Sequence, residues 1–162
     1  MNISSTFHSP ETTADAEAIY RESKHPIYLG GGQEVVLRLQ HDLEHVSDLI
    51  DLSNINELLG IYAEGPILSI GAGENHAAIA GSAVVVQKVP VLSELASNIG
   101  DSQTRNRGTI GGAIASKTRS SDWNAALLAL EAMIHTTKTS HMAGDYFANG
   151  GLTEGELITL SL

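Results

Sequence analysis

The run Arg105-Asn106-Arg107-Gly108-Thr109-Ile110-Gly111-Gly112 is the stretch of this 162-residue chain that decides its fold. Its glycine pair precedes an Ala- and Leu-rich stretch, residues 123–132, which predicts a helix. Glycines let backbone N–H groups approach phosphate oxygens without a Cβ in the way, and a helix N-terminus adds a favourable dipole. The run therefore predicts a phosphate-binding segment in front of a helix.

A second glycine cluster, Gly30-Gly31-Gly32, directly follows an apolar strand predicted at residues 26–29. One such cluster is weak evidence, since loops are rich in glycine. The two clusters, however, fall on opposite sides of a predicted boundary between two lobes. We therefore expect one long ligand between them, and a dinucleotide fits that description.

The hydrophobic pattern predicts an α+β fold in two lobes. The N-terminal α/β lobe is expected at residues 1–57. The larger lobe, with a mixed or antiparallel sheet and flanking helices, is expected at 58–162. The predicted helices are at 13–21, 34–39, 91–99 and 123–132, and the predicted strands are at 26–29, 45–52, 61–63, 67–70, 133–139 and 157–162. After the polar stretch 100–108, the glycine pair is expected to form a loop.

Acidic side chains outnumber basic ones, 19 against 9, which gives a formal net charge of −10. Such a surface is unsuited to neutralising phosphates, so we expect no binding to nucleic acid or to an anionic membrane. No apolar stretch approaches the roughly 18 residues of a membrane span. The first ten residues lack the pattern of a signal peptide, so the cytoplasm is the expected location. The chain has no cysteine, so it cannot itself hold an iron–sulfur cluster.

Residues 41–45, HDLEH, match the H-x-x-E-H pattern of some zinc peptidases, in which His41 and His45 would chelate the metal. No amphipathic helix surrounds the pattern, and no third ligand can be identified. So short a pattern arises easily by chance. We interpret it as a solvated surface segment.

Two further segments resemble nucleotide-binding loops incompletely. Residues 111–118, GGAIASKT, miss a Walker A loop because Ser116 stands where its second glycine is required. Residues 71–76 begin like a Rossmann G-x-G-x-x-G, but His76 replaces the glycine that allows close helix packing. Neither segment is expected to bind a nucleotide alone. His76 is kept as a candidate ligand-facing residue, because its turn faces the glycine segments.

The decisive run, preceded by Ile99-Gly100-Asp101 and followed by Ser121-Asp122, closely resembles the FAD-binding signature of xanthine dehydrogenases and carbon monoxide dehydrogenase medium subunits. Four other segments resemble further motifs of that family in the same order: residues 29–33, 51–61, 70–77 and 155–159. The matches cover nearly the whole chain. The sequence therefore resembles the flavoprotein subunit of the molybdenum hydroxylases.

The resemblance implies a two-lobed flavin domain with FAD in the cleft. The backbone of residues 30–34 and 109–113 would hold the pyrophosphate, and His76 would line the cofactor. Asp122 would bond the ribityl or sugar region, and Ile158 would pack beside the flavin. The implied cofactor-binding residues are Leu29, Gly30, Gly31, Gly32, Gln33, Glu34, His76, Thr109, Ile110, Gly111, Gly112, Ala113, Asp122 and Ile158. No catalytic side chain and no metal ligand are implied, because the redox chemistry belongs to the flavin.

The resemblance also implies partner chains, namely an iron–sulfur small subunit with 2Fe–2S clusters and a molybdopterin large subunit. Electrons would pass from molybdenum through the clusters to FAD, and then to NAD, a quinone or oxygen. The implied activity is that of an oxidoreductase, with this chain as its electron-transfer flavoprotein.

Some features depart from the family pattern. Ala113 replaces the usual Asn, and Glu34 places a carboxylate near the expected pyrophosphate, where it would repel phosphate unless it points away. Lys117 and Arg119 could offset that charge. The family continues past the position of Leu162 into a C-terminal domain of about a hundred residues. Two alternatives therefore stay open, a flavin-free structural or assembly subunit and a small nucleotide-binding module outside this family.

Overall fold

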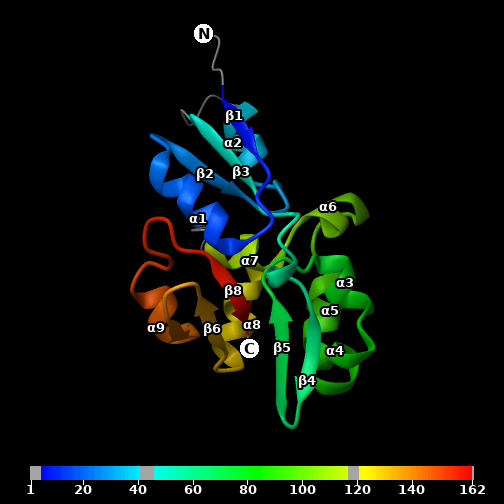
Figure 1. Cartoon of the computed structure of the whole chain (residues 1–162). Coiled ribbons are helices and arrows are strands. Elements are labelled where there is room, and N and C mark those ends of the chain that lie inside the picture. Colours follow the sequence, from blue (N-terminus) through cyan, green and yellow to red (C-terminus); the bar gives the residue numbers. More distant parts are fainter. Residues whose placement is uncertain (1–4, 41–45, 117–120, 162) are drawn as a thin grey trace.

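The computed structural model describes residues 5–40, 46–116 and 121–161, which form two β-sheets with helices around them (Figure 1). The HDLEH pattern at 41–45 lies outside the described residues, as do Lys117 and Arg119. None of the helices in the described ranges is both long enough and apolar enough to cross a membrane.

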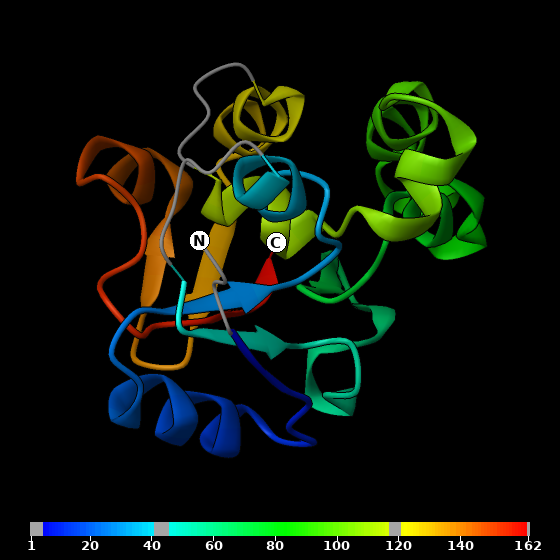
Figure 2. The same ribbon diagram turned by 90° about the horizontal axis from the view of Figure 1, so that it is seen from above.

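The N-terminal sheet is parallel, with strand order β1-β3-β2. Parallel neighbours need crossover connections, which the two helices supply. The first crossover runs from β1 past β3 to β2, and the second returns from β2 to β3. The two helices lie on opposite faces of the sheet, as Figure 2 shows, which is the arrangement expected when two right-handed crossovers run in opposite directions across a sheet. These elements are β1 (Thr6–His8), α1 (Thr13–Glu22), β2 (Pro26–Leu29), α2 (Val35–Gln40) and β3 (Asp48–Asp51).

The second sheet has the order β4-β5-β8-β6-β7, and every described pair in it is antiparallel. A short 3-10 helix, η1 (Asn56–Leu58), leads from the first sheet into it. The strands are β4 (Ile61–Glu64), β5 (Ile67–Gly71), β6 (Met133–Thr136), β7 (Ser140–Met142) and β8 (Ile158–Ser161). The predicted α+β class, with a small α/β lobe and a larger lobe built on an antiparallel sheet, is confirmed.

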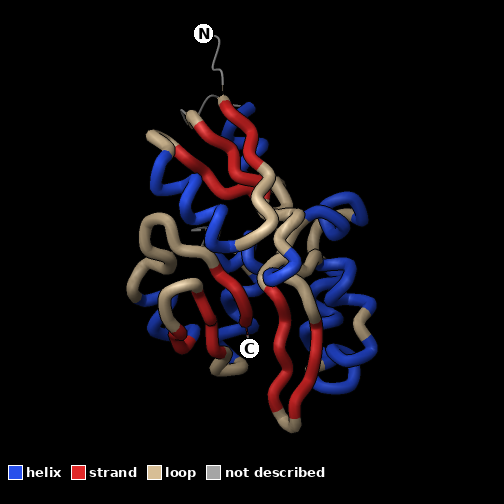
Figure 3. The backbone as a smooth tube through the Cα atoms, in the orientation of Figure 1, coloured by secondary structure: helices blue, strands red, loops and turns tan. Residues whose placement is uncertain are grey.

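The helices of the second part lie behind and beside this sheet in the view of Figure 3. Figure 1 shows α3, α4 and α5 beside the β4–β5 hairpin, and α9 lies next to β6 and β7 at the other end of the sheet. The helices are α3 (His76–Gly81), α4 (Ala83–Lys88), α5 (Pro90–Asn98), α6 (Ser102–Arg107), α7 (Ile110–Ala115), α8 (Asp122–Ala129) and α9 (Ala143–Ala148).

Buried apolar side chains form two clusters. The larger one lies between the antiparallel sheet and its helices and contains Trp123, Ile110 and Ile158. The smaller one lies beneath the parallel sheet, around Ala16 and Ile50, and it also contains Leu157. The C-terminal segment therefore contributes adjacent residues to both clusters, Leu157 to one and Ile158 to the other.

No element was predicted in the polar stretch 100–108, but α6 forms there, and the Asp101 side chain accepts from the Thr104 N–H at 2.7 Å. The predicted glycine-rich loop was wrong, because Gly111 and Gly112 lie in the first turn of α7. Glycine in a helix costs about 1 kcal/mol relative to alanine, so propensity alone favours a loop. Tertiary packing overrides it, because a Cβ on Gly111 would lie 2.6 Å from the Ala72 carbonyl oxygen.

Candidate cofactor-binding site

The first glycine segment leaves the carboxyl end of β2, which is where ligands bind in parallel sheets. Leu29 ends the strand, and residues 30–34 turn the chain into α2. Gly32 has a φ of +72°, a conformation that side-chain-bearing residues rarely adopt. Within the part of the chain that the structure describes, the backbone N–H groups of residues 30–34 donate no hydrogen bond. The loop therefore presents consecutive free donors.

The second glycine segment differs, because most of its N–H groups have acceptors inside the protein. Thr109 is the N-cap of α7, and its own N–H donates to no acceptor among the described residues. The other donations are from Ile110 to Glu74 O (3.0 Å), Gly111 to Ala72 O (2.8 Å), Gly112 to Thr109 Oγ1 (3.1 Å) and Ala113 to Thr109 O (3.0 Å). The backbone of this segment is thus hydrogen-bonded to the turn that follows β5.

The two glycine segments lie against each other. A Cβ added to Gly31 would lie 2.0 Å from the Arg107 carbonyl oxygen and 2.6 Å from the Gly108 Cα. One added to Gly30 would lie 2.9 Å from Thr109 Oγ1. The loop after β2 therefore lies in backbone contact with the segment that leads into α7, and only glycine fits at Gly31.

His76 lies behind the second segment. It is the first residue of α3, it is 5% exposed, and its N–H donates to the Gly108 carbonyl at 3.0 Å. Its ring stacks on Trp123 at a centroid distance of 5.8 Å. Burial lowers the pKa of His76 to about 4, so the ring is neutral at pH 7. Nδ1 has no hydrogen-bond partner among the described residues. His76 thus supports the signature segment from the interior.

The remaining candidates occupy different surroundings. Asp122 is exposed at the start of α8, and its carboxylate makes no hydrogen bond within the described ranges. Ile158 is 5% exposed and shares the larger cluster with Ile110, and Ala113 packs against that cluster. The structure therefore brings Ile158 close to α7 and leaves Asp122 free on the surface.

Glu34 points across to α7. Its carboxylate accepts a hydrogen bond from the Ser116 hydroxyl, and it lies 3.9 Å from the Arg38 guanidinium. The carboxylate of Glu34, a residue that differs from the family pattern, is thus held by two side chains of this protein. Ser116, the residue that spoils the Walker A match, is one of them.

Glu74 also positions the site, and the sequence analysis did not select it. Its backbone carbonyl accepts from Ile110, and its carboxylate accepts from the Gly60 N–H at 2.7 Å. It therefore ties α7 to the chain entering β4. The sequence feature that could have identified Glu74 is its position inside the glycine-rich turn at residues 71–76.

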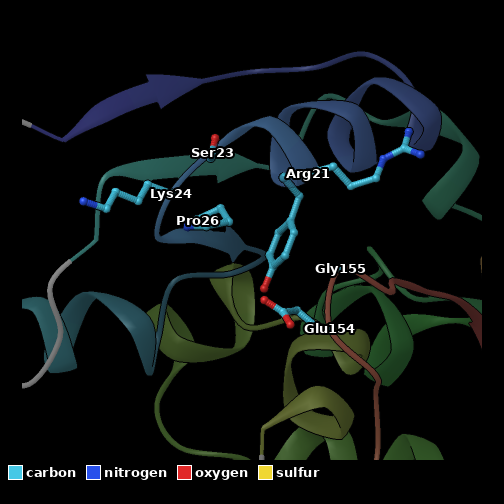
Figure 4. Close-up of a pocket in the computed structure, with 7 residues that line it drawn as sticks. Arg21, Ser23, Lys24, Pro26, Glu154 and Gly155 are labelled. Carbon is cyan, nitrogen blue, oxygen red and sulfur yellow. The ribbon is translucent and has the colours of Figure 1, made fainter.

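Two hollows on the described surface lie away from the glycine segments. One of about 320 Å³ opens between the end of α1 and the loop before β8, and it shares no lining residue with the glycine segments. Figure 4 shows Arg21, Lys24 and Glu154 around it. Nearby, the Tyr28 hydroxyl donates to the Gly155 carbonyl at 3.0 Å. This hollow carries no predicted site residue.

Residues 2–160 match the family described as the FAD binding domain in molybdopterin dehydrogenase, and the chain belongs to that family. Membership excludes the interpretation as a nucleotide-binding module outside it. The family's cofactor is FAD, and its class of protein is that of oxidoreductase subunits.

Individual relatives agree with this assignment. The chain is similar to the carbon monoxide dehydrogenase medium chain of Hydrogenophaga pseudoflava, with 35% identity over 78% of this chain and 44% of that one. The medium chain of Afipia carboxidovorans is 32% identical over 94% and 56%, and the xanthine dehydrogenase FAD-binding subunit of Escherichia coli O157:H7 is 30% identical over 72% and 40%. The chain spans about half the length of the curated relatives it matches.

Solved structures show the same fold. A chain of quinoline 2-oxidoreductase from Pseudomonas putida 86 superposes with a TM-score of 0.90 at 25% identity, covering 98% of this chain and 58% of that one. A chain of the carbon monoxide dehydrogenase from Hydrogenophaga pseudoflava gives 0.90 at 29% identity, with the same coverage.

Replacing Gly31 by alanine tests the backbone contact. We expect Gly31→Ala to lower the free energy of unfolding by at least about 2 kcal/mol, because its Cβ would overlap the Arg107 backbone. Gly81→Ala is the matched control, since nothing lies within 4 Å of its added Cβ, and it should be neutral or stabilising by up to about 1 kcal/mol. Urea unfolding followed by the fluorescence of Trp123, the only tryptophan, measures both. A Gly31→Ala protein as stable as Gly81→Ala would contradict the contact.

The buried imidazole of His76 predicts a pH dependence of stability. Its folded-state pKa of about 4 lies below the ordinary 6.5, so the unfolded chain binds the proton first as the pH falls. The stability linked to this group is therefore complete above pH 6.5 and is lost towards pH 4, by about 3 kcal/mol. His76→Gln should remove this component from urea unfolding measured across that range. A difference between wild type and variant that does not change with pH would show that the ring is not buried and neutral.

Proposed function

We propose that this chain carries FAD in a molybdenum-dependent dehydrogenase and passes electrons through it. The observation that supports the proposal most directly is the run of free backbone donors at residues 30–34, backed by the contact with residues 107–109. A pyrophosphate bound there would accept from several N–H groups at once. The free N–H of Thr109 would add a donor from the other segment.

The donor set suits a diphosphate on an acidic protein. The chain has a net charge of −10, so the site cannot depend on a general positive field. Backbone N–H groups bind phosphate oxygens without one, and an anion–N–H hydrogen bond is about twice as strong as a neutral one. Gly30 and Gly31 allow the close approach, and Gly32 provides the turn. The residues present therefore fit the cofactor.

The remaining residues hold this arrangement in place. Thr109 caps α7, while Ile110 and Ile158 anchor it in the larger cluster. We propose that the exposed carboxylate of Asp122 bonds the ribityl or sugar region. His76 is buried and neutral at pH 7, which suits a support for the signature segment. Bound FAD supplies the redox chemistry, and no side chain of this chain need move a proton.

The proposal includes partners. An iron–sulfur small subunit and a molybdopterin large subunit are proposed because relatives are named as medium chains or FAD-binding subunits. The lack of cysteine in this chain agrees, since clusters would have to be held elsewhere. NAD or a quinone as electron acceptor, and a cytoplasmic location, stay predictions.

A flavin-free structural subunit is the second candidate, and Ala113 favours it by removing the polar side chain that the family usually has there. The two candidates differ in flavin content. Stoichiometric association with partner subunits without flavin would support the second candidate, and a flavin spectrum in the purified complex would support the first.

A glycine pair with matched backbone geometry tests the loop. Gly32 and Gly65 both have positive φ, +72° and +57°, but Gly65 lies in the β4–β5 turn with nothing within 4 Å. Alanine at either costs about 1–2 kcal/mol of backbone strain. We expect Gly32→Ala to raise the FAD dissociation constant about tenfold or more, because the donors beside it move. Gly65→Ala should leave it unchanged.

Titration of FAD into each variant, followed by flavin fluorescence, measures the dissociation constants. Equal FAD affinity in the two variants would show that residues 30–34 do not hold the cofactor. Absence of FAD binding by the wild-type chain, alone and with its partners, would favour the flavin-free candidate.

A further inference from the structure

Glu34 and Ser116 join two segments that lie 82 residues apart in the sequence. One oxygen of the Glu34 carboxylate accepts from the Ser116 hydroxyl, and the other lies 3.9 Å from Arg38, four residues along α2. Because the acceptor is ionised, the Ser116 bond belongs to the stronger class of hydrogen bonds. This bond joins the residue just before α2 to the residue just after α7, and these two helices accompany different sheets.

The Glu34–Ser116 bond and the Gly31 contact lie near the two ends of the loop that carries the free N–H donors. At the start of the loop, Gly31 contacts the backbone of Arg107 and Gly108, just before α7 begins. At the end of the loop, Glu34 bonds Ser116, the residue at which α7 ends. The loop is therefore fixed to the α7 segment at both of its ends. The free N–H groups lie between these two points.

The charge of Glu34 opposes the binding of a diphosphate beside it. A carboxylate at the end of that loop repels phosphate, and the repulsion grows as the distance between the two groups shrinks. The hydroxyl of Ser116 holds the carboxylate on the α7 side. A freed carboxylate would be able to turn towards the loop donors.

We propose that the Glu34–Ser116 pair is a latch that positions the glycine loop and holds its carboxylate away from the cofactor phosphates. The inference rests on the proposed FAD site. Glu34 and Ser116 are positioning residues and do not contact the flavin. Because Glu34 is 46% exposed, its ion pair with Arg38 contributes little to folding, so the latch acts on ligand binding more than on stability.

Four variants separate the charge of Glu34 from its position. Glu34→Gln keeps an oxygen acceptor for Ser116 and removes the charge. Ser116→Ala removes the hydroxyl and leaves the carboxylate with Arg38 alone, and the double variant combines the two changes. Glu64→Gln, on an exposed position of β4, is the control for the change in net charge. Each is titrated with FAD and with riboflavin, which has the same flavin ring and no phosphate, at low and high ionic strength.

The latch predicts a specific pattern. Glu34→Gln should bind FAD about three- to tenfold more tightly at low ionic strength, with less gain at high ionic strength. Ser116→Ala should bind FAD about three- to tenfold more weakly than the wild type. In the Glu34→Gln background, the same substitution should change FAD affinity by less than about twofold relative to Glu34→Gln alone. Riboflavin affinity should change by less than about twofold in every variant, as should FAD affinity in Glu64→Gln.

Independent effects of the two substitutions, or equal effects on FAD and riboflavin, would overturn the latch while FAD binding by the wild type still stood. No FAD binding by the wild-type chain with its partners would overturn the proposed function, and the latch with it. Thermal unfolding of each variant without ligand shows whether a change in binding is a change in folding. If Ser116→Ala loses FAD binding only because it unfolds, Glu34→Gln decides, and an FAD affinity in Glu34→Gln that does not rise at low ionic strength would overturn the latch.

Discussion

The backbone contact between Gly31 and residues 107–108 is the constraint on which the arrangement of this site depends. It allows the loop after a strand of the parallel sheet to lie against the segment that opens α7, and no side chain fits there. The same segment is held on its other side by three backbone hydrogen bonds. The N–H groups of Gly111 and Ile110 donate to the carbonyls of Ala72 and Glu74, and the His76 N–H donates to the Gly108 carbonyl. One run of residues thus joins both sheets. Its glycines allow close packing within the protein, and the loop after β2 is left with the free donors.

These different roles of the two glycine segments are not what the simplest interpretation of a glycine pair before a helix predicts. In that interpretation, Gly111 and Gly112 expose N–H groups to a phosphate. In the structure, the N–H of Gly111 donates to Ala72 and that of Gly112 to the Thr109 hydroxyl. Local sequence cannot distinguish these cases, because both require a residue without a Cβ. For Gly111 the distinction depends on Ala72, in the turn after β5, which is distant in the sequence.

Much of the fold could be predicted from the sequence, because hydrophobic periodicity and turn residues are local signals. The strand at Pro26–Leu29, the β4–β5 hairpin and the α5 helix all follow from them. The short polar helix α6 could not be predicted in this way, since it depends on one capping carboxylate and on packing. At the site, the two glycine clusters were found, whereas Glu74 and the Glu34–Ser116 pair were not. Contacts across 82 residues leave no periodic signal in a single sequence.

Family membership and the geometry together define a consistent account of FAD binding by this chain. The most direct test is an amide chemical-shift titration of the 15N-labelled chain with FAD and, separately, with riboflavin. The account predicts that FAD shifts the amides of residues 30–34 and of Thr109 and that riboflavin, which lacks the phosphates, leaves them nearly unchanged. The internally bonded amides of Gly111 and Gly112 should respond less than those of residues 30–34. FAD-induced shifts confined to other parts of the chain, with residues 30–34 unaffected, would contradict it.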